Sequence, residues 1–305
     1  MPRMLNIFQH RATLRGVGTA ASVAGVSTPS FQRLGPAEPD SPLVVSVPHA
    51  GRDYPPALLA ALRVPPAALL PLEDRHVDAL AYAALGRHVC VVARSPRAWI
   101  DLNRSEQERD PRIDDGARAV ATPFQSARVR GGLGLIPRRA SGAADIWAGR
   151  FTADDVAARI ADIHRPYHLA VAQSLEAARE RFGVAILLDL HSMPPLSGTP
   201  QVQVVVGDRF GRSAGSRYVA RVEGTARDHR LAVARNTPYA GGYTLDRHGS
   251  PRKCVHALQV ELDRSLYLDA AMLAPGPHFA RTATMVSDMA DALVDEALTQ
   301  SIAAE

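Results

Sequence analysis

The chain has 305 residues, of which 46% are hydrophobic and 22% are charged, a composition typical of a soluble globular protein. Its net charge of +4 comes from scattered arginines mixed with acids, and no apolar run is long enough to cross a membrane, so a nucleic-acid groove and a membrane span are both excluded. Two cysteines without a CxxC motif fit a reducing compartment, and we expect a cytoplasmic protein.

Residues 1–30 differ in composition from the rest of the chain. They are basic and rich in glycine, alanine, serine and threonine, and they lack the continuous apolar core of a secretory signal. We therefore expect residues 1–30 to be a disordered or poorly ordered extension, and residues 31–305 to form a single α/β domain.

Short apolar runs in the first half of the chain are typical of buried strands. Residues 43–47 and 89–93 are two such runs, and His49 follows the first of them directly. Residues 99–104 predict a third strand, which closes in Asp-Leu-Asn-Arg. From residue 105 to 144 the chain is polar and glycine-rich, which predicts a loop excursion over the edge of the sheet.

A long helix and a buried strand follow. Residues 152–155 have the form of a capping box and start a helix that runs to about Arg181, with a kink or break at Pro166. Residues 184–193 begin with five apolar residues and continue with Asp189, His191 and Ser192, which predicts a strand buried on both faces. The other predicted elements are helices over 79–87, 216–229 and 279–302 and strands over 202–206 and 255–262.

Because strands alternate with helices, this order of elements predicts an α/β fold with a mixed, mostly parallel central sheet flanked by helices. Ligands of such sheets bind at the carboxyl ends of the strands. His49, His191 and Glu261 lie at or near predicted strand ends, and a cluster of acids and a histidine over 73–78 follows the first strand.

Two imidazoles and one carboxylate around an open position form the ligand set of a catalytic zinc, and a further carboxylate can act as its general base. No HExxH motif joins these residues in one element, so the ligands must come from distant segments. Their convergence is the testable expectation. A structural role for His191 stays open at this point.

The chain resembles the N-formylglutamate amidohydrolase family. The segments that carry the resemblance are 46–51 (SVPHAG), 73–78 (EDRHVD), 101–104 (DLNR), 134–138 (GLIPR), 166–168 (PYH), 188–193 (LDLHSM), 236–243 (NTPYAGGY) and 256–267 (HALQVELDRSLY). The resemblance implies a zinc-dependent exopeptidase-like (phosphorylase/hydrolase-like) fold. It also implies hydrolysis of N-formyl-L-glutamate to formate and L-glutamate, a late step of histidine degradation.

The same resemblance implies roles for site residues. His49, Asp74 and His191 would bind Zn²⁺ or a similar divalent metal, with Glu73 and His76 as competitors for the third ligand position. Glu261 would be the general base, and the alternative is a structural ion pair of Glu261 with Arg264 or Arg247.

The expected substrate is a small anionic N-acyl amino acid. Asn103 and Arg104 resemble a pair that holds a substrate carboxylate in related deacylases. Arg138 and Arg247 are the candidates for a second carboxylate, since a guanidinium fork suits this group. Tyr243, with Tyr239, is expected to line the pocket, and Asp189 either orients a ligand histidine or is solvated.

Three alternatives remain open from the sequence. The chain could deacylate another N-acyl amino acid, act as a cell-wall-type zinc amidase, or be a catalytically inactive ligand-binding relative. The Asp-Leu-Asn-Arg segment argues against the amidase, and the presence of Glu261 argues against the inactive relative. The sequence does not indicate an oligomeric state.

Overall fold

A seven-stranded sheet lies at the centre of the computed structural model, which describes residues 29–117, 126–140 and 145–303. Almost all of the expected extension, residues 1–30, lies outside these ranges. In spatial order the strands are β1 (Phe31–Leu34), β3 (Val89–Ala93), β2 (Leu43–Val47), β4 (Ala185–Met193), β7 (Val255–Asp263), β5 (Val204–Gly207) and β6 (Val233–Arg235).

The sheet is mixed and mostly parallel, as predicted. Strands β3, β2, β4 and β7 run parallel to one another, and β5 and β6 are parallel to each other. At the two junctions, β1 pairs antiparallel with β3 and β5 pairs antiparallel with β7. The predicted strands 43–47 and 89–93 are confirmed, and both are buried along their whole length. Their β-branched side chains suit a sheet that is covered on both faces. The sequence pattern did not predict the short strands β1 and β6.

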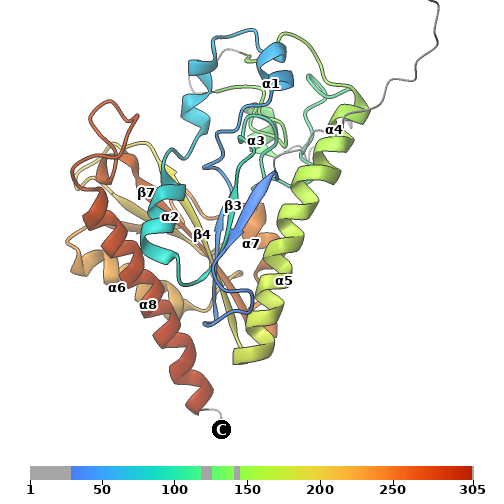
Figure 1. Cartoon of the computed structure of the whole chain (residues 1–305). Coiled ribbons are helices and arrows are strands. Elements are labelled where there is room, and N and C mark those ends of the chain that lie inside the picture. The colour runs from blue at the N-terminus through green and yellow to red at the C-terminus, as the bar shows by residue number, and fades with distance from the viewer. Residues whose placement is uncertain (1–28, 118–125, 141–144, 304–305) are drawn as a thin grey trace, which may run out of the picture.

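Helices cover both faces of the sheet (Figure 1). On one face lie α2 (Val77–Leu85), α6 (Ser216–Asp228) and α8 (Phe279–Ala303), and their apolar sides pack on β2, β4 and β7. On the other face lie α5 (Arg165–Phe182) and α7 (Tyr243–His248). None of the helices in the described ranges is long and apolar enough to cross a membrane.

The long predicted helix forms in three consecutive parts. The predicted capping box is confirmed at Thr152, which starts α4 (Ala153–Arg159) by accepting a hydrogen bond from Asp155 N–H. A single π-helical turn, Ile160–His164, leads into α5, and Pro166 lies in the first turn of α5. There its missing N–H costs little, because the preceding turn has a different hydrogen-bond pattern. The left-handed Gly183 ends α5.

A layer of short helices and loops lies beyond one end of the sheet (Figure 1). Its elements are α1 (Pro56–Ala61), the 3-10 turn η1 (Pro66–Leu72) and α3 (Ala127–Arg130), and it has its own apolar cluster. Two further 3-10 turns, Pro251–Lys253 and Arg264–Leu266, flank β7.

The predicted strand over residues 99–104 was wrong. Trp99 N–H and Arg104 N–H donate to backbone oxygens only three residues earlier, so the segment is a series of turns. Ile100 is buried in the apolar cluster of the outer layer, and Asp101 is buried among polar partners. Together with the bond of Asp101 N–H to the oxygen of Leu135, these local bonds take the place of a sheet ladder, and the turns carry Asn103 and Arg104.

Acid should destabilise the fold in part through His256 in β7. Burial lowers the pKa of His256 to about 4, and the charge of Arg217 adds to the effect. The neutral ring accepts a hydrogen bond at Nδ1 from Gly215 N–H at 3.2 Å. The pKa of a histidine in an unfolded chain is about 6.5. Between pH ~6.5 and ~4 the unfolded chain therefore binds a proton that the folded protein does not.

The free energy of unfolding should therefore fall as the pH drops through this window. Between pH 7 and pH 4 the free energy of unfolding should fall in both proteins. The fall should be about 1–2 kcal/mol smaller in the H256Q variant than in the wild type, with allowance for partial solvent screening. Urea unfolding at several pH values measures this difference. Equal pH dependence of both proteins would contradict the assignment.

Candidate active site

One face of the sheet changes from apolar to polar toward the carboxyl ends of its central strands. Along β4, Ala185 and Leu187 pack in the apolar cluster beneath α5, and Asp189 and His191 continue the same alternation. In the parallel ladder Asp189 pairs with Gln259 and His191 pairs with Glu261. The polar ends of β4 and β7 therefore lie side by side.

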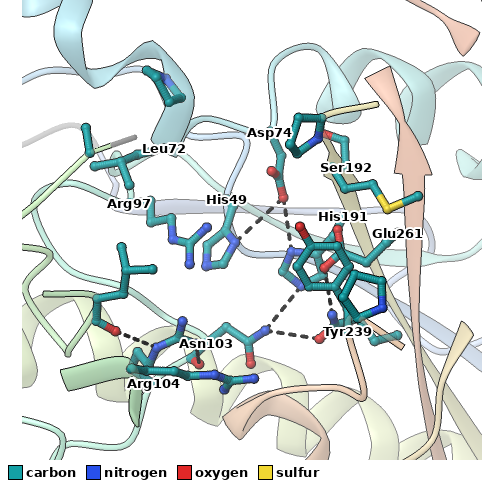
Figure 2. A pocket seen from close by; sticks show the side chains of 18 of the residues that line it. His49, Leu72, Asp74, Arg97, Asn103, Arg104, His191, Ser192, Tyr239 and Glu261 are labelled. Atoms are coloured by element: carbon teal, nitrogen blue, oxygen red, sulfur yellow. Dashed lines mark hydrogen bonds and ion pairs between the residues drawn. The ribbon is translucent and has the colours of Figure 1, made fainter. Parts of the chain in front are cut away.

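The three residues expected to bind a metal converge. His49, Asp74 and His191 each offer one ligand atom, and these atoms lie within 4.8 Å of one another. Asp74 Oδ2 is 3.0 Å from His191 Nδ1 and 3.6 Å from His49 Nδ1. Figure 2 shows the three side chains directed at one another, with Glu261 beside His191.

The competing ligands point elsewhere. Glu73 accepts a hydrogen bond from Arg75 at 2.6 Å and another from Tyr54. His76 contacts the backbone oxygen of Leu273 at 3.0 Å. Of the residues 73–78, Asp74 alone belongs to the histidine cluster in the described part of the chain.

Both histidines present Nδ1 to the cluster because their Nε2 atoms are already engaged. His49 Nε2–H donates to Asp101 at 2.7 Å, and His191 Nε2–H donates to Asp189 at 3.0 Å. His49 Nδ1 is buried and has no hydrogen-bond partner among the described residues. A buried nitrogen lone pair aimed at a carboxylate and a second imidazole fits a metal ligand, so this donor set suits a divalent ion such as zinc.

Asp189 orients His191 and is not solvated. It is fully buried, and Ser46 Oγ–H donates to its second oxygen at 2.7 Å. Ser46 in turn lies 2.9 Å from Tyr167 OH. Of the two roles considered from the sequence, the structure supports the orienting one.

Asp101 organises three other groups of the site. Besides His49, it accepts hydrogen bonds from Arg97 at 2.9 Å and from Asn103 N–H at 2.9 Å. Burial would raise the pKa of Asp101, but the charges of Arg97, Arg104 and His49 hold it well below its usual range. Asp101 therefore stays ionised and holds the imidazole of His49 in one tautomer.

Glu261 is buried at the end of a hydrogen-bond chain. Thr244 N–H donates to Asn103 Oδ1 at 2.9 Å, Asn103 donates to Gln259 at 3.2 Å, and Gln259 donates to Glu261 Oε1 at 2.7 Å. Gly242 permits this chain, since a Cβ there would lie 2.2 Å from Asn103 Oδ1. Burial raises the pKa of Glu261 to about 7, although the charge of His191 lowers it.

The structural ion pairs considered for Glu261 do not form. Arg264 instead donates to the backbone oxygen of Glu73 at 2.6 Å and to Asp74 Oδ1 at 3.2 Å. It thereby fixes the carboxylate oxygen of Asp74 that faces away from the histidines. Arg247 donates to Tyr243 OH at 2.8 Å.

These groups line a cavity of about 610 Å³. Asn103, Arg104 and Tyr239 contribute to its walls, as expected, whereas Arg138, Arg247 and Tyr243 do not. The sequence reasoning missed the lining residues Arg97, Arg128, Arg139, Arg264 and Gln259.

Physical reasons explain the displaced residues. Arg138 is 2% exposed and pairs with Asp110 at 3.0 Å and with Asp145, so its charge is neutralised away from the cavity. Tyr243 packs against the rings of His164 and His168, with centroids 5.6 and 5.2 Å away.

Buried histidines support the loop that carries Asn103 and Arg104. His168 Nε2–H donates to the backbone oxygen of Leu102 at 2.8 Å, and His164 Nε2–H donates to that of Arg104 at 2.9 Å. Burial lowers the pKa of both rings, which are neutral at physiological pH. They lie outside the metal-ligand cluster.

Comparison with known proteins places this arrangement among amide hydrolases. The model of the N-formylglutamate amidohydrolase family matches residues 41–268. The chain is 31% identical to an N-formylglutamate deformylase of Pseudomonas putida over 242 residues, which are 75% of this chain and 82% of that protein. A second N-formylglutamate deformylase, from Pseudomonas aeruginosa, is 29% identical over 237 residues, with the same shares covered.

Solved structures show the same likeness. The crystal structure of N-formylglutamate amidohydrolase from Ralstonia eutropha superposes with a TM-score of 0.78 at 30% sequence identity. The match covers 91% of this chain and 100% of that chain.

The D101N variant should bind zinc about 10- to 100-fold more weakly, because the isosteric amide removes the negative charge that holds His49. Competition with a chromophoric chelator measures this affinity. D110N is the matched control, since Asp110 is also a buried carboxylate and pairs with Arg138 outside the cluster. Unchanged zinc affinity in folded D101N protein would refute the role given to Asp101.

Proposed function

Because the chain belongs to the N-formylglutamate amidohydrolase family, we propose that it hydrolyses the N-formyl amide of N-formyl-L-glutamate to formate and L-glutamate. The observation that carries the proposal is the position of Glu261 beside the cluster of His49, Asp74 and His191 in one cavity. Two imidazoles, one ligand carboxylate and one further carboxylate are the groups that hydrolytic zinc chemistry needs.

In this proposal His49 Nδ1, His191 Nδ1 and Asp74 hold a divalent metal, with zinc as the first choice. When bound, such an ion polarises an amide carbonyl and lowers the pKa of water. Asp101 and Asp189 keep the two imidazoles in the tautomer that leaves Nδ1 unprotonated. Arg264 holds the other oxygen of Asp74, so the carboxylate has one orientation.

Glu261 is the general base and later the general acid. It accepts a proton from the attacking water and passes it to the amine nitrogen as the carbon–nitrogen bond breaks. A pKa of about 7 suits both directions of this transfer. The bond from Gln259 occupies Oε1, so Oε2 is the oxygen available for the proton.

Arg97 and Arg104 supply positive charge next to the reacting groups. Arg97 donates a hydrogen bond to Asp101, and Figure 2 shows the guanidinium of Arg97 beside His49. In this proposal Arg97 stabilises the negative charge that develops on the carbonyl oxygen of the substrate. Arg104 follows Asn103 and binds a substrate carboxylate in this proposal.

Removal of the metal should abolish formate release from N-formyl-L-glutamate. Chelator treatment followed by desalting should leave less than about 1% of the activity if the metal supplies several kcal/mol of transition-state stabilisation. Addition of Zn²⁺ should restore the activity, and a desalted sample without chelator is the control. Full activity in protein shown by elemental analysis to be metal-free would contradict the proposal.

The E261Q variant should lose about 10²- to 10⁴-fold in kcat, because the amide cannot accept a proton. Its bound zinc, measured by elemental analysis, should equal that of the wild type, since Glu261 is not part of the ligand set. The substrate panel should include N-formyl and N-acetyl amino acids. Turnover of these compounds by E261Q at the wild-type rate would rule out the role of Glu261.

A further inference from the structure

Positive charge is concentrated in the catalytic cavity. Two carboxylates, Asp74 and Glu261, line it, and both belong to the proposed chemistry. Five arginines also line the cavity: Arg97, Arg104, Arg128, Arg139 and Arg264. A cavity with such an excess of cations attracts anions, and the number of unpaired cations indicates how many negative groups it can bind.

Three of the five arginines already face a carboxylate. The pairs are Arg97 with Asp101 at 2.9 Å, Arg139 with Asp145 at 3.3 Å and Arg264 with Asp74 at 3.2 Å. Each of these charges has a carboxylate beside it, although Asp101 also pairs with His49 and Asp145 also pairs with Arg138. The other two, Arg104 and Arg128, have no carboxylate within hydrogen-bonding distance in the described part of the chain.

Arg104 is held in place by neutral partners. Its Nε–H donates to the oxygen of Leu133 at 2.8 Å, and one terminal nitrogen donates to the oxygen of Asn103 at 2.7 Å. The closest carboxylate, Asp101, is 3.8 Å away. Arg104 is only 5% exposed, and Asp101, its distant ion-pair partner, also holds His49 and Arg97, so a further anion would compensate the buried charge of Arg104.

Arg128 lies on α3 and is exposed at the cavity wall. Among the described residues, its guanidinium makes one hydrogen bond, a long one of 3.4 Å to the oxygen of Gly241. Its backbone is better anchored, because Leu133 N–H donates to the oxygen of Arg128 at 2.8 Å and Ser126 caps the helix. Arg128 is therefore a weakly held cation at the cavity wall on a well-anchored backbone.

The two cations act on each other. Burial lowers the pKa of Arg104 to about 10; the charge of Asp101 opposes this effect, and the charges of Arg97 and Arg128 add to it. A ligand that carries two negative groups relieves both charges at once. A ligand with one negative group leaves either Arg104 or Arg128 without a carboxylate at hydrogen-bonding distance.

We propose that Arg128 is the residue that selects an acidic side chain, by binding the side-chain carboxylate of the N-acyl amino acid while Arg104 binds the α-carboxylate. This assignment rests on the proposed function. The buried Arg104 follows Asn103, whose amide leads through Gln259 to Glu261, so it lies at the reacting end of the substrate. The exposed Arg128 suits the carboxylate that extends toward the opening.

The test compares N-formylglutamate with N-formylglutamine, which has the same shape and no side-chain charge. In R128M the ratio of the two kcat/KM values should fall about 10- to 100-fold, the effect of losing one charge-assisted pair. R130M is the matched control, because Arg130 lies on the same helix and does not line the cavity. Its ratio should equal that of the wild type.

A binding measurement separates this inference from the proposed function. Calorimetry with glutarate, a dicarboxylate without an amide, should show binding to zinc-loaded wild-type protein and to R130M, and at least about 10-fold weaker binding to R128M. If the wild type fails to hydrolyse N-formylglutamate but binds glutarate through Arg128, the proposed function is wrong and the anion site stands. If the wild type hydrolyses N-formylglutamate and R128M keeps the full preference over N-formylglutamine, the role of Arg128 is refuted and the function stands.

Discussion

The in-register pairing of β4 with β7 is the constraint on which the site depends. It places His191 opposite Glu261 and Asp189 opposite Gln259 on the same face of the sheet. A slip of either strand by one residue would turn its two polar side chains to the opposite face, which is packed with the apolar residues Leu188, Leu190, Leu258 and Val260. Hydrophobic packing on one face therefore fixes the register, and the register fixes the relative positions of the polar side chains on the other face. A ligand and a base carried by adjacent strands need no loop to keep them together.

The buried charges of the site are arranged in layers. Asp101 and Asp189 lie behind the two imidazoles, and Ser46, Arg97 and backbone N–H groups satisfy these carboxylates in turn. Burying a carboxylate is costly unless it is paired, and here each one is paired with a group that the site uses. The same bonds that compensate the charge also fix the imidazole tautomers. Stability and preorganisation of the metal ligands thus come from the same contacts.

The sequence predicted the sheet well because the apolar runs 43–47, 89–93 and 184–188 are nearly unbroken and are followed by polar residues or proline. The sequence also predicted that His49, His191 and Glu261 would converge, since the carboxyl ends of neighbouring parallel strands lie at the same edge of the sheet. Residues 99–104 were predicted as a strand because Trp99, Ile100 and Leu102 look like one, but the burial of Asp101 by non-local partners overrides that pattern. The arginines were the hardest to assign. Arg138 and Arg128 both lie in the glycine-rich segment, and only the position of Asp110 and Asp145 explains why the first is neutralised and the second is not.

The excess of arginines in the cavity has to be reconciled with a divalent cation in the same space. Repulsion between the ion and the guanidinium groups would weaken metal binding if the charges were mixed at random. The structure pairs the arginines nearest the imidazoles: Arg97 faces Asp101, Arg264 faces Asp74, and the carboxylates Asp74, Asp101 and Asp189 surround the two rings. Arg128, by contrast, lies on α3 in the outer layer. The carboxylates close to the imidazoles therefore attract a cation, and Arg128 on the outer layer attracts an anion. An anionic substrate that binds to the arginines also cancels their repulsion of the metal, so substrate and metal should stabilise each other in the cavity through charge alone.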